Sequence, residues 1–399
     1  MSQLHGHRRS RDVVAVLAAL VVCLLGGASA RAANPAVSFQ KVVEEHFLAW
    51  DQDHDGVLSP LEIDRQVQNP AVKGFEAAAV SAIHICFRGE KSPARLSQVD
   101  LLQYSEKESE RRDKDDHKFH FAADYAAFDR HIHELPRQIF TVANAPSLEG
   151  IAQGKLGDCY LVAVVGAAVH RDPRTVRNMF RIHIDGSNEI VFPNGQALKV
   201  PALTDSEIML GSSAANQGLW LNVLEKAYGQ IKMRNPKAVK TLADLDLDVI
   251  ARGGDAQHTL SILTGHKCNW DPFYSKKAKD AEPSREQVEA VRQHMHAKLA
   301  DAAAHRRLVC ISSPRTKLPP GIITGHDYAM LGYDSQRRLV HVWNPWGRTY
   351  NFKPKHERHG LEHGYPVEKG HFDIPLDDFV RVFNGVWFET YDPLQVSHK

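Results

Sequence analysis

The chain has 399 residues, with 49 basic and 48 acidic side chains and a formal net charge of +1. This balance excludes a nucleic-acid-binding protein held by bulk electrostatics, which needs a basic excess or a basic stripe. The shares of hydrophobic residues, 43%, and charged residues, 24%, are those of a globular protein of two or three domains, and they exclude a wholly disordered chain or a multi-span membrane protein.

Residues 1–32 have the pattern of a secretory signal peptide. Arginines within 8–11 precede an uncharged run over 13–25, and small residues follow up to Ala32. An uncleaved anchor is the alternative, but an apolar run of about 13 residues is shorter than the ~20 that cross a bilayer. We predict export to the cell envelope or the medium, with no membrane span left after cleavage and with Cys23 removed. Export would allow a disulfide, although spacing indicates no pairing, among Cys86, Cys268 and Cys310.

Residues 51–62 match the twelve-residue calcium loop of an EF-hand at every ligand position. Carboxylates stand at positions 1, 3 and 5, Gly56 stands at the sharp turn of position 6, and a glutamate stands at position 12. Calcium is a hard cation that takes six to eight oxygen ligands, which this set supplies. We predict one calcium ion bound by Asp51, Asp53, Asp55, the carbonyl of Val57, Ser59 and Glu62.

A second, degenerate hand is predicted from residues 96–102, which repeat the pattern of 57–62 when Leu96 is aligned with Leu58. A helix is expected over 77–87, before this repeat. In the alignment, residues unsuited to calcium stand at the ligand positions: Gly89, Lys91 and Pro93. The second hand is therefore expected to pack against the first without binding metal.

Cys159 is a candidate nucleophile because it stands where a loop with two glycines meets an apolar helix. Asp158 is expected to cap this helix, and the apolar run 161–169 predicts that the helix is buried. At a helix start the free N–H groups and the positive dipole end favour thiolate, so we expect a lowered pKa for Cys159. The side-chain amide of Gln153 and the Cys159 N–H would form an oxyanion hole. An inert buried cysteine is the alternative.

The run 153–159, Gln-Gly-Lys-Leu-Gly-Asp-Cys, resembles the active-site motif of the calpain family of papain-like cysteine peptidases. The histidine of that family stands in a Gly-His-x-Tyr segment that opens a strand, and residues 325–328 match it. The asparagine begins Asn-Pro-Trp-Gly, which residues 344–347 match after the strand-like run 339–343. The resemblance covers roughly residues 135 to 390.

The resemblance implies a triad of Cys159, His326 and Asn344. His326 would take the Cys159 proton, form an imidazolium–thiolate pair and then protonate the leaving amine. Asn344 would orient the imidazole and fix its tautomer. Three further residues would line the cleft. Trp346 would shield the His–Asn bond from water, and the alternative is an ordinary core aromatic. Gly253 and Gly254 would let the substrate backbone approach closely, and the alternative is a plain pair of loop glycines.

The expected fold class is α+β. A papain-like two-lobed core would have a helical lobe with Cys159 and a β-rich lobe with His326 and Asn344, and a small α-helical EF-hand module would precede it. The predicted segments are the signal peptide 1–32, the EF-hand pair 33–104, a charged helix or linker 105–134, and the lobes 135–252 and 253–399.

We predict an exported, calpain-like cysteine endopeptidase that acts on proteins or peptides. Residues 33–134 are further expected to lie against the cleft and respond to calcium. Only Glu149 falls near the acidic positions that hold calcium in the core of the animal members, so no core calcium site is predicted. A papain-like acyl transferase is one alternative, against which Asn344 counts because Asp is usual there. A non-catalytic calcium-binding or interaction protein is another, against which the complete Cys, His, Asn and Gln set counts.

Overall fold

The computed structural model describes residues 37–89, 92–110, 119–141, 146–184, 187–240, 244–274 and 283–394. The predicted signal peptide, Lys91 of the predicted second hand and residues 111–118 of the predicted linker lie outside this part. Residues Phe39–Lys399 form one compact unit. Within the described part no helix is both long and apolar enough to cross a bilayer.

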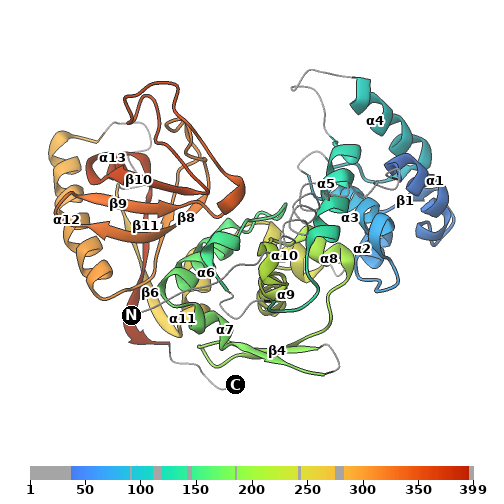
Figure 1. Cartoon of the computed structure of the whole chain (residues 1–399), viewed down its shortest axis with the longest axis horizontal. Coiled ribbons are helices and arrows are strands. Elements are labelled where there is room, and N and C mark those ends of the chain that lie inside the picture. Colours follow the sequence, from blue (N-terminus) through green and yellow to red (C-terminus); the bar gives the residue numbers. More distant parts are fainter. Residues whose placement is uncertain are drawn as a thin grey trace, which may run out of the picture. The chain divides into compact units, whose positions relative to one another are not determined.

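The N-terminal module, residues 37–134, is built from helices and one short pair of strands. Figure 1 draws it in blue to blue-green. The elements are α1 (Phe39–Trp50), β1 (Val57–Leu58), α2 (Pro60–Val67), α3 (Gly74–Arg88), β2 (Leu96–Ser97), α4 (Gln98–Glu110) and α5 (Phe121–Glu134). Strands β1 and β2 are antiparallel, with Leu58 opposite Leu96. The two residues that the sequence repeat aligns therefore face each other, and α3 confirms the helix expected over 77–87.

The start of α2 follows from three residues of the loop that precedes it. Ser59 is the N-cap, Pro60 occupies the first helical turn, and Ser59 and Glu62 form a capping box. Such a box satisfies two backbone N–H groups that would otherwise lack partners. The helix that follows loop 51–62 is therefore fixed to the last residue of that loop.

The helical lobe, residues 146–264, follows the module in the chain. It contains the short helices η1 (Leu148–Gly150) and η2 (Ala215–Gln217), helices α6 (Cys159–Arg171), α7 (Pro173–Arg177), α8 (Asp205–Leu210), α9 (Trp220–Met233), α10 (Asp246–Ala251) and α11 (Ala256–Thr264), and an antiparallel sheet of β3 (Phe180–Ile182), β4 (Asn188–Val191) and β5 (Ala197–Val200). Helix α6 is buried continuously over 160–169, as its apolar run predicted. Gly166 permits this packing, because a Cβ there would lie 2.3 Å from the ring of Trp343.

The sheet lobe, residues 265–394, is centred on a six-stranded sheet in the order β10-β9-β8-β7-β11-β6. Its neighbouring strands are antiparallel. Helices α12 and α13 contribute to its core with Met295, Leu299 and Phe379. The elements are β6 (His266–Pro272), α12 (Arg285–Ala304), β7 (Val309–Ser312), β8 (Asp327–Asp334), β9 (Leu339–Trp343), η3 (Gly347–Thr349), β10 (His371–Pro375), α13 (Leu376–Val382) and β11 (Gly385–Pro393).

These elements confirm an α+β fold with a helical part and a β-rich part. The strand expected over 339–343 is β9, and β8 begins directly after His326. The predicted lobe boundary at residue 252 falls before α11, which packs on α6 and also on β6 and β11. Helix α11 thus connects the two lobes, and the domain limits stay predictions.

The N-terminal module is docked on the helical lobe through α8. Helices α2, α3 and α5 all contact α8. The Asp205 carboxylate, 3% exposed as a residue, accepts hydrogen bonds from the Gly74 N–H at 3.0 Å and from Arg137 at 2.9 Å. On the far side of α5, Asp124 pairs with Lys155 of the loop before Cys159 at 2.7 Å. The module therefore contacts the loop that carries the candidate nucleophile.

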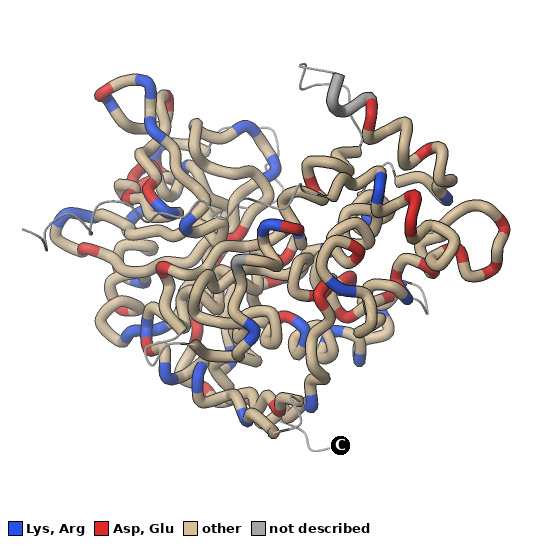
Figure 2. The backbone as a smooth tube through the Cα atoms, turned by 45° about the vertical axis from the view of Figure 1, so that its right-hand side comes forward, with Lys and Arg blue, Asp and Glu red and all other residues tan. Residues whose placement is uncertain are grey.

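Charges of both signs are interspersed along the described chain (Figure 2). The thiols of this part are all free, so the disulfide left open by the sequence is not formed among them: Cys86, Cys159, Cys268 and Cys310. Burial raises the pKa of Cys86 to about 12 and that of Cys310 well above its usual value. Of these four thiols, Cys159 is partly exposed and the other three are buried.

Candidate active site

Cys159 is the first residue of α6, in the position expected from the sequence. The Asp158 carbonyl accepts the N–H groups of Leu161 and Val162, at 2.8 and 3.1 Å. The Asp158 side chain makes no capping bond, so the expectation that it caps the helix was wrong. Its fully buried carboxylate faces the loop instead and accepts a hydrogen bond from Gln153 Nε2 at 3.1 Å.

His326 and Asn344 lie at neighbouring strand ends, with His326 just before β8 and Asn344 just after β9. Their side chains meet with 3.0 Å between His326 Nε2 and Asn344 Oδ1. The Trp346 backbone N–H also points to Asn344 Oδ1, at 2.9 Å. Because an N–H can only donate, this atom must be the amide oxygen, and His326 Nε2 must carry hydrogen. The lone pair of the neutral imidazole is therefore on Nδ1.

Two aromatic rings hold the His326 imidazole. The Trp346 ring lies 5.3 Å from it, centroid to centroid, and the Tyr328 ring meets it edge-on at 5.0 Å. Ser313 Oγ accepts the His326 N–H at 2.9 Å and so fixes the backbone. Asn344 is fully buried, and its Nδ2 has no partner. Trp346 therefore lies beside the His–Asn bond, where the sequence predicted it.

The Cys159 end of α6 meets the His326 end of β8. Helix α6 packs against β8 and β7. The backbone N–H of Asp327, the residue after His326, hydrogen-bonds Cys159. The Gln153 N–H donates to the Pro345 carbonyl at 2.8 Å, which connects the nucleophile loop to the segment after Asn344. The fold thus brings together three sequence motifs that are far apart in the chain.

The expected low pKa of Cys159 was wrong. Burial raises the pKa of the Cys159 thiol to about 12, and the negative charges of Asp327 and Asp158 act in the same direction. The backbone N–H groups of Asp327 and Tyr160 favour the thiolate, but they do not outweigh burial. Burial also lowers the pKa of His326 to about 4, against the bond to Asn344. Both shifts favour a neutral thiol and a neutral imidazole over a thiolate–imidazolium pair.

Gln153 lies in the loop before Cys159, but its side-chain amide is already engaged. Nε2 donates to the Leu156 carbonyl at 2.8 Å and to the Asp158 carboxylate at 3.1 Å, and Oε1 is buried without a partner. These two bonds use both amide hydrogens within the loop. The oxyanion-hole role of Gln153 stays a prediction.

Gly254 lies against Tyr160, the residue after Cys159, and Gly253 is connected to Tyr160 through Lys232. Gly253 has φ +81°, and a Cβ on Gly254 would lie 2.6 Å from the Tyr160 ring. Lys232 Nζ donates to the Tyr160 hydroxyl and to the Gly253 carbonyl, each at 2.9 Å. Packing against Tyr160 is therefore a structural reason for Gly254. Sequence reasoning missed both this reason and Lys232.

Two acidic residues near the nucleophile were also missed. Glu225 of α9 is fully buried near Asp158, and it accepts the Ser212 N–H at 2.9 Å. Burial and repulsion from Asp158 raise the pKa of Glu225, and burial raises the pKa of Asp158 to about 6. Burial also raises the pKa of Asp327 to about 6. Glu225 is an acidic residue inside an apolar helical run, and this pattern was the sequence signal for a buried acidic group.

Loop 51–62 has the geometry that a calcium loop requires. Oxygens of Asp51, Asp53 and Asp55 lie within 4.8 Å of one another. Gly56 has φ +85°, and its N–H donates to Asp51 Oδ2 at 2.9 Å. Asp51 is 1% exposed, and its Oδ1 is buried without a hydrogen-bond partner. An unpartnered buried carboxylate oxygen of this kind fits a cation ligand.

Glu62 closes the loop by accepting N–H groups from both of its ends. Its Oε1 accepts from Gln52 at 2.8 Å, and its Oε2 accepts from the Ser59 N–H at 2.8 Å. Burial alone would raise the pKa of Glu62, but these hydrogen bonds lower it below its usual value. Arg95, beside β2, pairs with Asp55. The three aspartates therefore form a cluster that fits calcium, whereas the ligand roles of Val57, Ser59 and Glu62, and calcium binding itself, stay predictions.

Comparison with known proteins agrees with the motifs. Residues 128–386 match the model of a family described as calpain family cysteine protease, and the match includes Cys159, His326 and Asn344. No curated protein matches the chain. The family match covers more than half of the 399 residues. The chain therefore belongs to the calpain family of cysteine proteases.

Proposed function

We propose that this cysteine peptidase is an exported endopeptidase in which Cys159 is the nucleophile, His326 transfers protons and Asn344 orients His326. The observation that carries this assignment is the bond between His326 Nε2 and Asn344 Oδ1 at 3.0 Å. With hydrogen fixed on Nε2, the Nδ1 lone pair is available to a thiol. The helix that begins at Cys159 packs against β8, the strand that follows His326.

Acylation begins with proton transfer from Cys159 Sγ to His326 Nδ1 while the sulfur attacks the substrate carbonyl carbon. The carbonyl electrons move to oxygen, and the Cys159 N–H at the start of α6 would stabilise the oxyanion. His326 then donates its Nδ1 proton to the amine as the C–N bond breaks. The products are an acyl-thioester and a free amine.

Deacylation repeats these steps with water. His326 Nδ1 takes a proton from water as the hydroxyl attacks the thioester carbon, and the C–S bond breaks when the intermediate collapses. The proton returns to sulfur, which restores the neutral pair. Asn344 and Trp346 keep the imidazole in one tautomer and orientation throughout both steps.

Export and calcium binding belong to this proposal for separate reasons. Export rests on residues 1–32, and calcium binding rests on the ligand set of loop 51–62. Calcium, when bound, would hold this loop and the first turn of α2 in one arrangement. The Oδ1 atom of Asp51, which has no hydrogen-bond partner, and the carboxylates of Asp53 and Asp55 would hold the ion.

The catalytic assignment is tested by casein hydrolysis with the mature protein. Cys159→Ala and His326→Ala should each abolish cleavage while circular dichroism stays native. Cys268→Ala, which removes a buried thiol elsewhere, is the matched control and should remain active. An epoxysuccinyl reagent should label Cys159 alone. Casein cleavage by the Cys159→Ala protein would overturn the assignment.

A further inference from the structure

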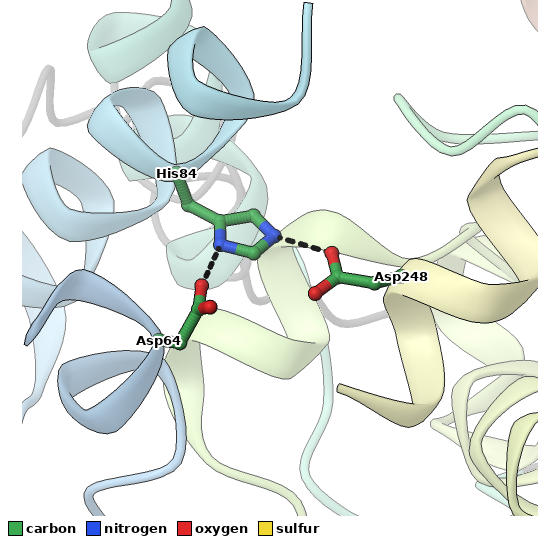
Figure 3. Close-up of side chains that lie close together, drawn as sticks. All are labelled: Asp64, His84 and Asp248. Atoms are coloured by element: carbon green, nitrogen blue, oxygen red, sulfur yellow. Dashed lines mark hydrogen bonds and ion pairs between the residues drawn. The ribbon is translucent and has the colours of Figure 1, made fainter. Parts of the chain in front are cut away.

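A buried charged cluster joins the N-terminal module to the helical lobe. His84 of α3 lies between Asp64 of α2 and Asp248 of α10, as Figure 3 shows. Nδ1 lies 3.1 Å from Asp64 Oδ1, and Nε2 lies 3.1 Å from Asp248 Oδ1. The three side chains are 5% exposed or less. Two carboxylates that are 184 positions apart in the chain, those of Asp64 and Asp248, thus share one imidazole.

Arg88, one turn after His84, completes the cluster. Its Nε donates to Asp248 Oδ1 at 2.8 Å, and its Nη2 donates to Asp248 Oδ2 and to Asp64 at 2.7 Å. The guanidinium therefore occupies the space between the carboxylates that a metal ion would need. The His84 nitrogens point to opposite sides, each to a different carboxylate. The cluster is a charge-balanced joint and not a metal site.

One end of this joint lies just after the predicted calcium loop. Asp64 follows Glu62, the last residue of that loop, by two positions on the same short helix α2. Glu62 accepts N–H groups from both ends of the loop, and the capping box fixes it to the start of α2. A change in the position of Glu62 therefore moves the Asp64 carboxylate with it.

The other end of the joint supports the nucleophile turn. Asp248 accepts the Leu245 N–H at 3.1 Å and so holds the start of α10. Two residues later, the Ile250 carbonyl accepts the Tyr160 hydroxyl at 3.3 Å. The next carbonyl, that of Ala251, lies so close to Gly157 that a Cβ there would approach it to 2.3 Å. Gly157 and Tyr160 flank Cys159 on both sides.

We propose that Asp64, His84, Arg88 and Asp248 are positioning residues that transmit the state of loop 51–62 to the nucleophile turn. The order of contacts is Glu62, α2, the charged cluster, α10, and then Gly157 and Tyr160. This inference rests on the proposed function, because it takes the loop to bind calcium and Cys159 to be the nucleophile. By thermodynamic linkage, a reversible ligand that binds the calcium-loaded form of the nucleophile turn more tightly would raise the calcium affinity by the same factor.

The experiment measures the rate at which iodoacetamide modifies Cys159 in the full mature chain, with calcium and with a chelator. In the wild-type protein, calcium should raise this rate by about tenfold, a typical coupling between sites. In His84→Gln, the ratio of the labelling rate with calcium to the rate with chelator should fall to about twofold or less. Calorimetry should still find calcium binding by loop 51–62 in this variant, because His84 is not a ligand.

Asp205→Asn is the matched control. Asp205 is also a buried carboxylate that docks the module on the helical lobe, but it lies on α8. Its hydrogen bonds are with Lys73, Gly74 and Arg137, which lie outside α2 and α10. In Asp205→Asn, the ratio of labelling rates with calcium and with chelator should equal that of the wild type, even if the melting temperature of this variant falls. Arg88→Lys is a milder variant, since it keeps the charge but loses the two-sided contact, and its ratio should lie between those of the wild type and His84→Gln.

A wild-type ratio in folded His84→Gln or in Arg88→Lys would overturn the inference, as would a wild-type protein that binds calcium without any change in labelling. Neither result would affect the peptidase assignment, which depends on casein cleavage and its loss in Cys159→Ala. Loss of the calcium ratio in Asp205→Asn as well would also count against the inference, because it would show that any weakened docking has the same effect.

Discussion

His326 and Trp346 pack ring against ring, with centroids 5.3 Å apart and planes inclined by 58°. The same tryptophan donates its backbone N–H to the Asn344 oxygen that faces His326. Trp346 therefore covers the His326 imidazole and also determines that the oxygen of the Asn344 amide faces this imidazole. The tautomer of His326 follows from this arrangement and not from a charge on the third residue of the triad.

Replacing Asn344 should impair catalysis more than substrate binding. In Asn344→Ala, the His326 Nε2–H loses its acceptor, and both the tautomer and the orientation become variable. We expect kcat to fall by about 100-fold, with KM changed little. Steady-state kinetics on a fluorogenic peptide would measure this. Asn351→Ala, which alters an exposed asparagine beyond the motif, is the control, and an unchanged kcat in Asn344→Ala would contradict the role of Asn344.

The alkylation of Cys159 should depend steeply on pH. A thiol whose pKa is raised to about 12 has a thiolate fraction that grows about tenfold per pH unit throughout the neutral range. The second-order rate with iodoacetamide should therefore rise continuously from pH 6 to pH 9. A resting thiolate–imidazolium pair would instead give a plateau over this range. Such a plateau in the free enzyme would contradict the neutral pair.

Removing the charge of Asp327 should make Cys159 more reactive. Asp327 opposes ionisation of the thiol, and its own pKa is raised to about 6, so it is charged at pH 8 and largely neutral at pH 5. Asp327→Asn should speed alkylation by roughly threefold at pH 8 and have almost no effect at pH 5. Asp334→Asn, at the other end of β8, is the control. An equal effect at both pH values would indicate a conformational cause.

Glu62→Gln should weaken calcium binding without unfolding the loop. Glutamine can keep the capping box with Ser59, but it lacks the bidentate carboxylate that calcium takes at position 12. Calorimetry should show an affinity lower by about 100-fold or more, while the melting temperature in chelator changes little. Glu45→Gln, on the exposed side of α1, should bind as the wild type does. Full affinity in Glu62→Gln would contradict the ligand set.

The charged cluster should make the free energy of unfolding depend on pH in two ways. The contribution of His84 is lost as pH rises, and that of Asp248 is lost as pH falls. Burial alone would lower the pKa of His84, but the bonds to Asp248 and Asp64 raise it above 6.5. Its stabilisation is therefore complete below about pH 6.5 and is lost as pH rises through the raised folded value. Those bonds also lower the pKa of Asp248 despite its burial, so its stabilisation is lost at strongly acidic pH. Melting curves should lose the alkaline slope in His84→Gln, and its persistence there would assign the slope to another group.

Local patterns predicted the elements of the fold well. Leu58 and Leu96, which the sequence repeat aligned, face each other in β1 and β2. The apolar run after Cys159 predicted a buried helix, because ten consecutive residues without charge can only be covered on all sides. The motifs around His326 and Asn344 predicted strand ends, and the sheet then brings those ends together.

Properties that depend on burial could not be predicted in this way. The helix start at Cys159 indicated a low pKa, but the sheet lobe covers the thiol and reverses the shift. Asp158 had the sequence position of a cap, although its carboxylate turns to Gln153. The partnership of Asp64, His84 and Asp248 left no local signal, because each residue is polar in its own helix and gains its partners only on packing.

The charged cluster around Asp248 also determines whether the full-length peptidase can be compared with a form that lacks the N-terminal module. Cutting the chain before residue 135 would remove His84 and Arg88, the two cations that neutralise Asp248, and would leave this carboxylate without a partner. It would also expose the apolar side of α8 to solvent. A shortened peptidase would then be inactive because it misfolds, whatever calcium does. The N-terminal module serves the peptidase as part of its folding unit, so its contribution must be separated one side chain at a time.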